Sequence, residues 1–398
     1  MIVFMVFFPR PLSIVPGIFG VLAFLAYPKV FGHRPAVPKP AVAICVVTCL
    51  FAFLSCLWAV DPSLSLTRAA KVTLLLLPSL FLLSVASALP KHLVLRYLWL
   101  IPAAVAVNLV LIVIEIANDL TLLRFFQNIP AEQVIHLHEL NRPAVAAALL
   151  FFPTLAILWQ ILDLRKSVKL LMTAGLLALI ISITLWSDSQ GAGFAFMISA
   201  LAFLLFPYRY KAAWVVAALI LVGGIMTAPW TVQWGFKNYA AQINDMPFVG
   251  MGDGHGAQRL EIYDFLGKKI LERPILGYGI EASRSMTMEA HFFTAPGTIA
   301  NLNIFHPHNF ALQLWMEFGL IGALAGCALA LYLLWQVYSY GLDRYQRSMF
   351  ATLIAFFAII STTYNLWTGW WLGFVLIFVT IMILLKKSYG ADTVKPSN

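Results

Sequence analysis

The chain has 398 residues, of which 61% are apolar and only 11% charged, and its formal net charge at pH 7 is +9. Its mean hydropathy is +0.87. Soluble domains carry roughly 25% charged residues, so this composition excludes an ordinary soluble domain and indicates a membrane protein. The excess of cations is interpreted as a signal of membrane topology, and nucleic acid is not predicted as a partner.

Long apolar segments recur along the chain, and a helix needs about 20 such residues to cross a bilayer. In chain order, spans are expected near residues 40–59, 70–88, 95–117, 143–162, 168–186, 190–206, 211–228, 309–336, 346–363 and 366–385. Residues 2–27 are long for one span and short for two, and Pro9, Arg10 and Pro11 interrupt them. The pattern predicts an all-α polytopic membrane protein with 11–12 transmembrane helices.

The Lys and Arg residues indicate the orientation of these spans. They gather on alternate connections: Lys29, Arg34 and Lys39; Lys91 and Arg96; Arg165, Lys166 and Lys169; Arg209 and Lys211; Arg344 and Arg347; Lys386, Lys387 and Lys395. Cations concentrate on the cytoplasmic side of membrane proteins. We therefore expect a bacterial inner-membrane protein made of N-terminal helices (1–228), a large periplasmic loop (229–308), and C-terminal helices with a short cytoplasmic tail (309–398).

The expected loop at 229–308 differs in composition from the rest of the chain. It holds half of the eight histidines: His255, His291, His306 and His308. Residues 258–273 have apolar side chains at helical spacing, and Pro274 with the Gly277-Tyr278-Gly279 turn ends that helix. Loops this long are usually functional or disordered. The alternative is a segment that only connects two helices.

Two ionisable residues lie at the start of the next apolar segment. His308 opens it and Glu317 follows nine residues later, at a depth where a charged side chain is costly and usually functional. A histidine has a pKa close to operating pH, so His308 is a candidate general base. The alternative for His308 is a residue that only caps the helix.

Two arginines are candidates for binding an anion. A guanidinium group matches phosphate oxygens bidentately, and Arg142 lies at the start of the expected span 143–162 while Arg259 lies in the large loop. Either one alone can instead be a snorkelling or topology residue. The pairs His136/His138 and His306/His308 have the spacing of metal ligands, but no motif of a catalytic zinc site accompanies them, and no metal is predicted.

The run from His308 and Asn309 to Gln313, continued by Glu317, Gly319 and Gly322, resembles the signature of the O-antigen ligase and O-antigen polymerase superfamily. Arg259, followed by Pro274 and Gly277-Tyr278-Gly279, is similar to the loop helix and bend of that family. One position departs from the pattern, because Gln190 stands where family members often carry an arginine. The family usually has twelve spans with an N-terminal hairpin, which favours two helices in residues 2–27.

The resemblance implies a GT-C-like membrane glycosyltransferase. It would transfer O-antigen glycan, with inversion, from undecaprenyl diphosphate to the lipid A–core of lipopolysaccharide at the periplasmic face, without metal or cofactor. The alternatives are an O-antigen polymerase, a protein O-oligosaccharyltransferase and, from another class, a polysaccharide transporter.

The resemblance also implies roles for particular residues. His308 would be the base, and Glu317 or Glu261 would orient its imidazole or an arginine. The residues expected at the diphosphate are Arg259, Arg142, Arg284 and Gln190. His306, Glu261 and Asn309 are secondary candidates, and the sequence leaves open which histidine of the 306/308 pair is the base.

Overall fold

The computed structural model describes residues 3, 6–130, 132–187, 189–244, 255–290, 300–304, 306–341 and 344–389. The α-helices are α1 (Val15–Phe31), α2 (Lys39–Ser55), α3 (Pro62–Ala88), α4 (Lys91–Tyr97), α5 (Leu100–Ala117), α6 (Thr121–Gln127), α7 (Asn141–Ala156), α8 (Lys166–Trp186), α9 (Gln190–Leu205), α10 (Lys211–Asn244), α11 (His255–Glu272), α12 (Phe310–Tyr338), α13 (Arg344–Ile360) and α14 (Gly369–Tyr389). Shorter helical turns are η2 (Arg10–Ser13), η3 (Leu137–Leu140), η4 (Ile157–Ile161) and η5 (Ala282–Ser285). The strands β1 (Thr287–Ala290) and β2 (Ala300–Asn303) form an antiparallel pair.

The helices confirm an all-α polytopic membrane protein. Within the described residues, seven helical segments are long and apolar enough to cross a membrane: Pro62–Ala88, Lys91–Ala117, Leu137–Ile161, Lys166–Trp186, Lys211–Gln242, Phe310–Tyr338 and Gly369–Tyr389. Shorter apolar helices are Val15–Phe31, Lys39–Ser55, Gln190–Leu205 and Tyr345–Ile360. The expected number of 11–12 spans therefore depends on these shorter helices as well as on the seven longer segments found among the described residues.

The N-terminal segment differs from the expected helical pair. Its described residues form the turn η2 followed by one α-helix, α1. The prolines start the turn rather than separating two helices, and η2 packs closely on α14. A Cβ added at Gly373 would lie 1.8 Å from the Leu12 carbonyl oxygen, so this contact requires a glycine.

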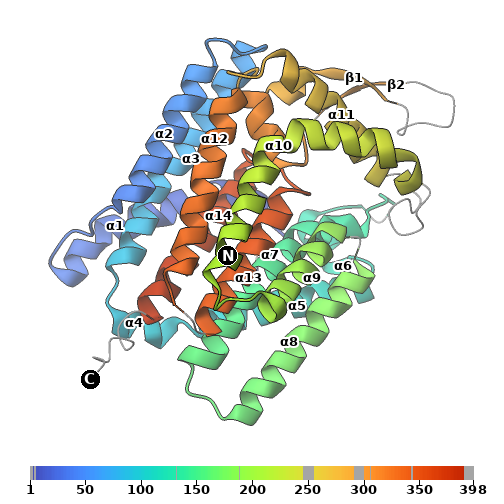
Figure 1. Ribbon diagram of the computed structural model, residues 1–398. Helices are drawn as coiled ribbons and strands as arrows, with labels where there is room; N and C mark the ends of the chain where they lie inside the picture. Colours follow the sequence, from blue (N-terminus) through green and yellow to red (C-terminus); the bar gives the residue numbers. More distant parts are fainter. Residues whose placement is uncertain are drawn as a thin grey trace.

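Helix α10 continues beyond residue 228, where the large loop was expected to begin. It extends to Asn244 with Pro229 inside it, and its last part turns away from the bundle (Figure 1). A proline inside a helix removes one backbone hydrogen bond and causes such a bend. Helix α11 confirms the helix predicted at 258–273. It packs closely on α10, as shown by Gly267, where an added Cβ would lie only 2.7 Å from the Pro229 carbonyl oxygen.

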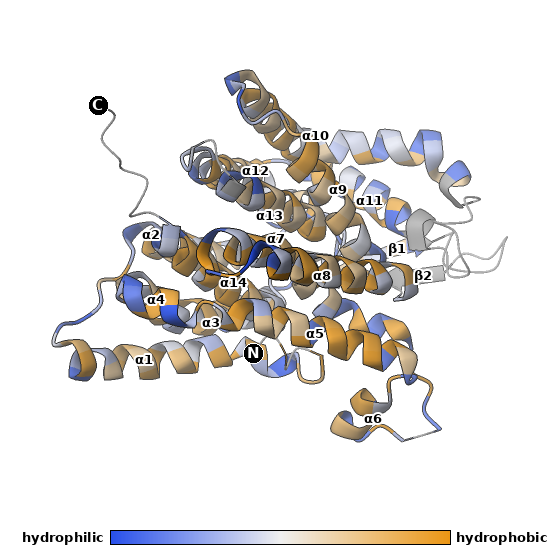
Figure 2. Cartoon of the chain, turned by 90° about the horizontal axis from the view of Figure 1, so that it is seen from below, coloured by the Kyte–Doolittle hydropathy of each residue, from blue (hydrophilic) through white to orange (hydrophobic). Residues whose placement is uncertain are grey.

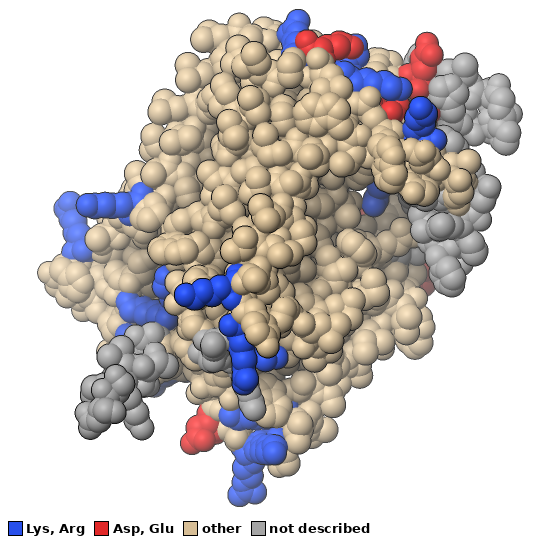
Figure 3. Space-filling model, viewed as in Figure 1, with Lys and Arg blue, Asp and Glu red and all other residues tan. Residues whose placement is uncertain are grey.

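The bundle has one end that carries α11 and the β1–β2 pair (Figure 1), which we call the α11 end. The helices are mostly apolar along their length, while α11 is more polar (Figure 2). On the face shown in Figure 3, most of the acidic side chains lie at the α11 end, and Lys and Arg predominate at the opposite end. Helix α7 is buried along most of its length from Pro143 onward, and Arg142 directly precedes this buried part.

Candidate active site at the α11 end of the bundle

Helix α12 is broken at Gly319, and the turn that follows α11 fills the break. Gly319 has φ +59° and ψ −148°, a conformation open essentially only to glycine. The backbone groups released by the break are bound by the turn. Tyr278 N donates to Met316 O (2.9 Å), Gly279 N donates to Glu317 O (2.9 Å), and Leu320 N donates to Pro274 O (2.8 Å). The bend after α11 and the Glu-x-Gly of α12 therefore form one structural unit.

The same turn is also fixed to α2 and α3. Ile280 donates its N–H to Ser55 Oγ (3.1 Å), and its carbonyl accepts a hydrogen bond from Ser65 Oγ (2.6 Å). The Trp58 indole donates to the carbonyl of Leu276 (3.0 Å). Hydrogen bonds from α2, α3 and α12 thus fix the position of the turn next to the candidate site.

His308 lies directly before α12, in the left-handed conformation (φ +53°). Its Nδ1 lies 3.1 Å from the Thr363 carbonyl oxygen, and its own carbonyl accepts a hydrogen bond from Tyr263 of α11 (3.2 Å). A carbonyl can only accept, so Nδ1 carries the proton and Nε2 is the basic nitrogen of the ring. Burial raises the pKa of Tyr263 to about 12, against the opposing charge of Arg259, so this hydroxyl stays protonated at neutral pH.

Asn309 has a structural role. Its side-chain oxygen accepts hydrogen bonds from the N–H groups of Ala311 (3.0 Å) and Leu312 (3.1 Å), which makes it the N-cap of α12. The His-Asn pair of the motif therefore combines a candidate base with the residue that starts the helix behind it.

His306 lies against His308, with 3.8 Å between the ring centroids. Burial lowers the pKa of His306 to about 4, the Thr363 carbonyl acts in the opposite direction, and the charges of Arg284 and Arg259 lower it further. The two arginines are therefore close enough to His306 to act on its charge. A pKa this low makes His306 a weak base at neutral pH, so we keep His308 as the candidate base of the pair.

Acidification is expected to destabilise the folded protein through His306. Between its ordinary pKa of 6.5 and about 4, the unfolded chain binds a proton that the folded chain does not bind. The free energy of unfolding should therefore fall as the pH falls through this window, by up to about 3 kcal/mol. Thermal unfolding at pH 7 and pH 4.5 measures the effect, and a His306→Gln variant should show a smaller difference. An equal difference in both proteins would exclude His306 as the cause.

Glu317 is fully buried below the histidines. Its carboxylate accepts hydrogen bonds from Gln313 Nε2 (2.9 Å) and from the indole N–H of Trp367. Gln313 also donates to Asn365 Oδ1 (3.0 Å), and its own side-chain oxygen accepts the N–H of Leu366 (3.0 Å). These contacts make Glu317 part of a polar network that joins α12 to the segment between α13 and α14.

That segment, residues 361–368, was not predicted as part of the site. It contains the Thr363 carbonyl that holds His308. It also lies near Arg142 and Gln190, two of the residues predicted to bind the diphosphate. Arg142 lies over the Trp370 ring, 5.6 Å from its centroid, and acts on the charge of Tyr364. Gln190 is exposed at the start of α9, and a Cβ at the next residue, Gly191, would lie 2.7 Å from Thr363 Oγ1.

A buried carboxylate joins two arginines on the other side of the network. Glu281 is fully buried, and its Oε1 lies 2.7 Å from Arg68 Nη2 and 2.6 Å from Arg284 Nε. Arg68 was not predicted as a site residue, because it lies just before the expected span 70–88, whereas in the structure it belongs to α3. Because one buried carboxylate oxygen contacts both guanidinium groups, Glu281 and Arg68 restrict the position of Arg284.

The remaining candidates are Glu261 and the other histidines that the sequence analysis named. Glu261 is buried on α11, two residues from Arg259. The rings of His136 and His138 are 5.6 Å apart. In the part of the chain that the structure describes, no group of three His, Cys, Asp or Glu side chains is placed to hold a metal ion. His291 and the side chain of His255 lie outside the described residues.

Comparisons with known proteins agree with the resemblance seen in the sequence. A family model described as O-Antigen ligase matches residues 174–327, from α8 into α12. Two curated proteins named "Putative polysaccharide ligase" are similar to it over most of its length. The protein from Rickettsia conorii is 26% identical over 352 residues, covering 88% of this chain and 81% of its own length. The one from Rickettsia prowazekii is 25% identical over 343 residues, covering 86% and 79%.

No solved structure matches the chain. The matched range contains Arg259, Glu281, His308, Glu317 and Gly319, while Arg142 and residues 361–368 lie outside it. Together with the helical membrane architecture and the neighbouring Arg and His side chains, these matches make the chain similar to the O-antigen ligase family.

Proposed function

We propose that this protein is an inverting glycosyltransferase of the bacterial inner membrane. It transfers O-antigen glycan from undecaprenyl diphosphate to the lipid A–core of lipopolysaccharide, with the α11 end facing the periplasm. The large excess of Lys and Arg at the opposite end supports this orientation (Figure 3). Outside the cytoplasm no nucleotide-activated sugar is available, and a diphosphate-linked glycan brings its own leaving group.

The observation that carries the proposal is the grouping of two arginines with two histidines at one end of α12. Arg259 and Arg284 both act on the charge of His306, whose ring lies against His308. A guanidinium group binds phosphate oxygens, and a neutral imidazole accepts a proton. The two kinds of group together match a reaction in which a hydroxyl loses a proton while a diphosphate leaves.

The proposed step uses these groups as follows. His308 Nε2 takes the proton of an acceptor-sugar hydroxyl, and the hydroxyl oxygen attacks the anomeric carbon of the donor glycan. The bond from that carbon to the diphosphate oxygen breaks, and undecaprenyl diphosphate leaves with the electron pair. Arg259 and Arg284, with Arg142 and Gln190 at the neighbouring segment, stabilise the negative charge of the leaving group. Attack opposite the leaving group inverts the anomeric centre.

A transfer assay with purified protein tests the function. We expect undecaprenyl-diphosphate-linked glycan and lipid A–core to give glycosylated lipid A–core, at the same rate with and without EDTA. Glycan growing on the lipid carrier instead would identify a polymerase, and transfer to Ser or Thr of a protein would identify an oligosaccharyltransferase. Loss of transfer in EDTA that returns with a divalent cation would contradict charge stabilisation by arginines alone.

Replacing Arg259 with glutamine is expected to lower the transfer rate about 100-fold to 1,000-fold, the effect of removing one donor that stabilises developing charge. Arg259→Lys should recover only part of the rate, because lysine lacks the planar fork. Lys269→Gln is the matched control, since Lys269 lies on the same helix and contacts Glu272 (2.9 Å). Equal losses in the Arg259→Gln and Lys269→Gln proteins would argue against a specific role for Arg259.

A further inference from the structure

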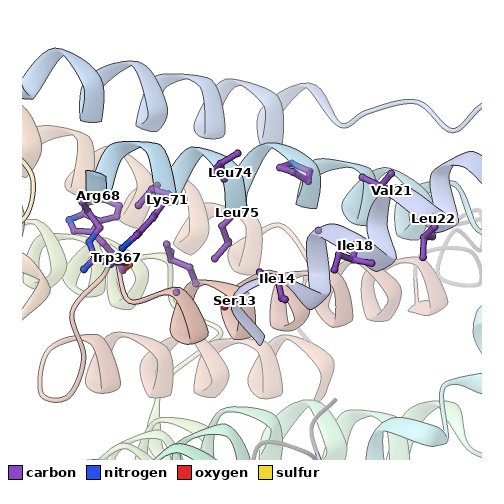
Figure 4. A pocket seen from close by; sticks show the side chains of 15 residues that line it. Ser13, Ile14, Ile18, Val21, Leu22, Arg68, Lys71, Leu74, Leu75 and Trp367 are labelled. Carbon is purple, nitrogen blue, oxygen red and sulfur yellow. Dashed lines mark hydrogen bonds between the residues drawn. The ribbon is translucent and has the colours of Figure 1, made fainter. Parts of the chain in front are cut away.

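A groove open to the lipid runs between α1, α3 and α14. Its volume is about 680 Å³, and most of its lining is apolar, from residues such as Ile18 and Val21 of α1 and Leu74 and Leu75 of α3 (Figure 4). Ile18 is 51% exposed and Leu74 is 74% exposed, so the groove opens sideways toward the lipid. A groove of this kind can take a hydrocarbon chain that lies along the bundle.

One end of the groove is cationic. Arg68 and Lys71 gather there beside Trp367 (Figure 4). Lys71 follows Pro62 by nine residues, which places it about 14 Å along α3. An ammonium group at such a depth is costly unless it meets an anion or reaches the interface. Arg68 binds Glu281, but Lys71 has no hydrogen-bond or ion-pair partner among the described side chains.

The cationic end is connected to the candidate active site. Arg68 Nη1 donates to the Trp367 carbonyl (3.0 Å), and the Trp367 indole donates to Glu317. Through Glu281, Arg68 also shares one carboxylate oxygen with Arg284. Arg68, Lys71 and Arg284 together carry more positive charge than Glu281 balances. An anion at Lys71 would therefore reduce the excess of positive charge. It would lie close to Arg68, which is connected to Glu317 of the candidate active site through Trp367.

We propose that this groove binds the acceptor, a phosphate-bearing glycolipid, with one hydrocarbon chain along α1 and α3 and a phosphate at Lys71 and Arg68. The assignment to the acceptor rests on the proposed function, in which Arg259, Arg284 and Arg142 already bind the diphosphate of the donor. Two lipid-anchored substrates need two entries to one reaction centre. The groove supplies an entry on the other side of the Glu281 network, with a cationic end for a phosphate.

Steady-state kinetics in nanodiscs of zwitterionic lipid test the assignment. In Lys71→Gln we expect KM for lipid A–core to rise about tenfold, the loss of one hydrogen bond to a charged group. Ile18→Trp, which fills the groove from an exposed position, should also raise this KM. In both variants kcat and the KM for the donor should stay within about twofold of the unmodified protein. Lys39→Gln and Leu219→Trp, at exposed positions that do not line the groove, are the matched controls and should leave all three constants unchanged.

A rise in the donor KM, or no change in either KM, would overturn the proposal. A binding measurement without donor separates it from the proposed function: a photoreactive lipid A probe should be captured by the unmodified protein and much less by Lys71→Gln. Removing the phosphates of the probe, but not adding phosphatidylglycerol, should prevent capture. Equal competition by phosphatidylglycerol would overturn the proposal. Lys71-dependent capture without any transfer would support the lipid site and contradict the proposed function.

Discussion

Replacing His308 with alanine is expected to lower glycan transfer by about two to four orders of magnitude, the usual contribution of a positioned general base. The ring is held by the Thr363 carbonyl at Nδ1, which leaves Nε2 as the proton acceptor. Alanine removes that acceptor while the N-cap of α12, Asn309, remains. The loss should therefore appear in kcat, and the amount of folded protein recovered from membranes should stay the same.

Transfer by a His306→Gln protein should be compared with transfer by His308→Ala, to show which of the two histidines is the base. His306 lies against His308, but burial lowers its pKa to about 4, which makes it a poor base at neutral pH. Its replacement should cost less than that of His308 and should leave the acid limb of the rate–pH profile in place. Turnover of His308→Ala at the rate of the unmodified protein would exclude His308 as the base, and a larger loss in His306→Gln would transfer that role to its neighbour.

Replacing Gly319 with alanine is expected to release the turn after α11 from α12. A Cβ at this position would lie 2.3 Å from the Ile275 carbonyl oxygen, and φ +59° with ψ −148° is unfavourable for any other residue. The conformational strain alone is about 1–3 kcal/mol, and the overlap adds to it. We expect a lower unfolding temperature, faster proteolysis near residues 274–281 and loss of transfer, because Arg284 and Glu281 follow the turn directly.

The matched control for Gly319 is Gly224→Ala. Gly224 lies inside α10, and a Cβ there would have no neighbour within 4 Å. Alanine favours a helix over glycine by about 1 kcal/mol, so this variant should be as stable as the unmodified protein or more stable. If Gly319→Ala unfolds at the same temperature as Gly224→Ala, the turn is not held in the way described above.

Much of the architecture could be predicted from the sequence because hydropathy and charge are local properties. Each expected span after residue 39 corresponds to an apolar helix, and α11 was predicted within a few residues. At the N-terminus this reasoning left one or two spans open, and the described residues form one α-helix where the family resemblance favoured a pair. It also missed the extension of α10 past Pro229, because a proline after an apolar run indicates an end more often than a bend.

The roles assigned to the site residues stay predictions, although the structure brings several of them near one another. The rings of His306 and His308 are 3.8 Å apart, and the charges of Arg259 and Arg284 act on His306. The partners that support them could not be found from periodicity. Arg68 meets Glu281 across 213 positions of sequence, and Gln313 meets Asn365 across 52. Contacts of this kind depend on how the helices pack, and local patterns of hydropathy and charge do not predict that packing.

The turn after α11, which fills the break in α12, also has partners on both sides of it in the chain. Its partners in α2 and α3, such as Ser55 and Ser65, leave the ribosome long before it, whereas its partners Met316 and Glu317 leave after it. The turn can therefore form its first set of hydrogen bonds before α12 has been made, and its second set only afterwards. The segment at 361–368, whose Thr363 carbonyl holds His308, is made later still, so a chain that stops after α12 has every arginine of the candidate site but lacks the partner that holds its histidine.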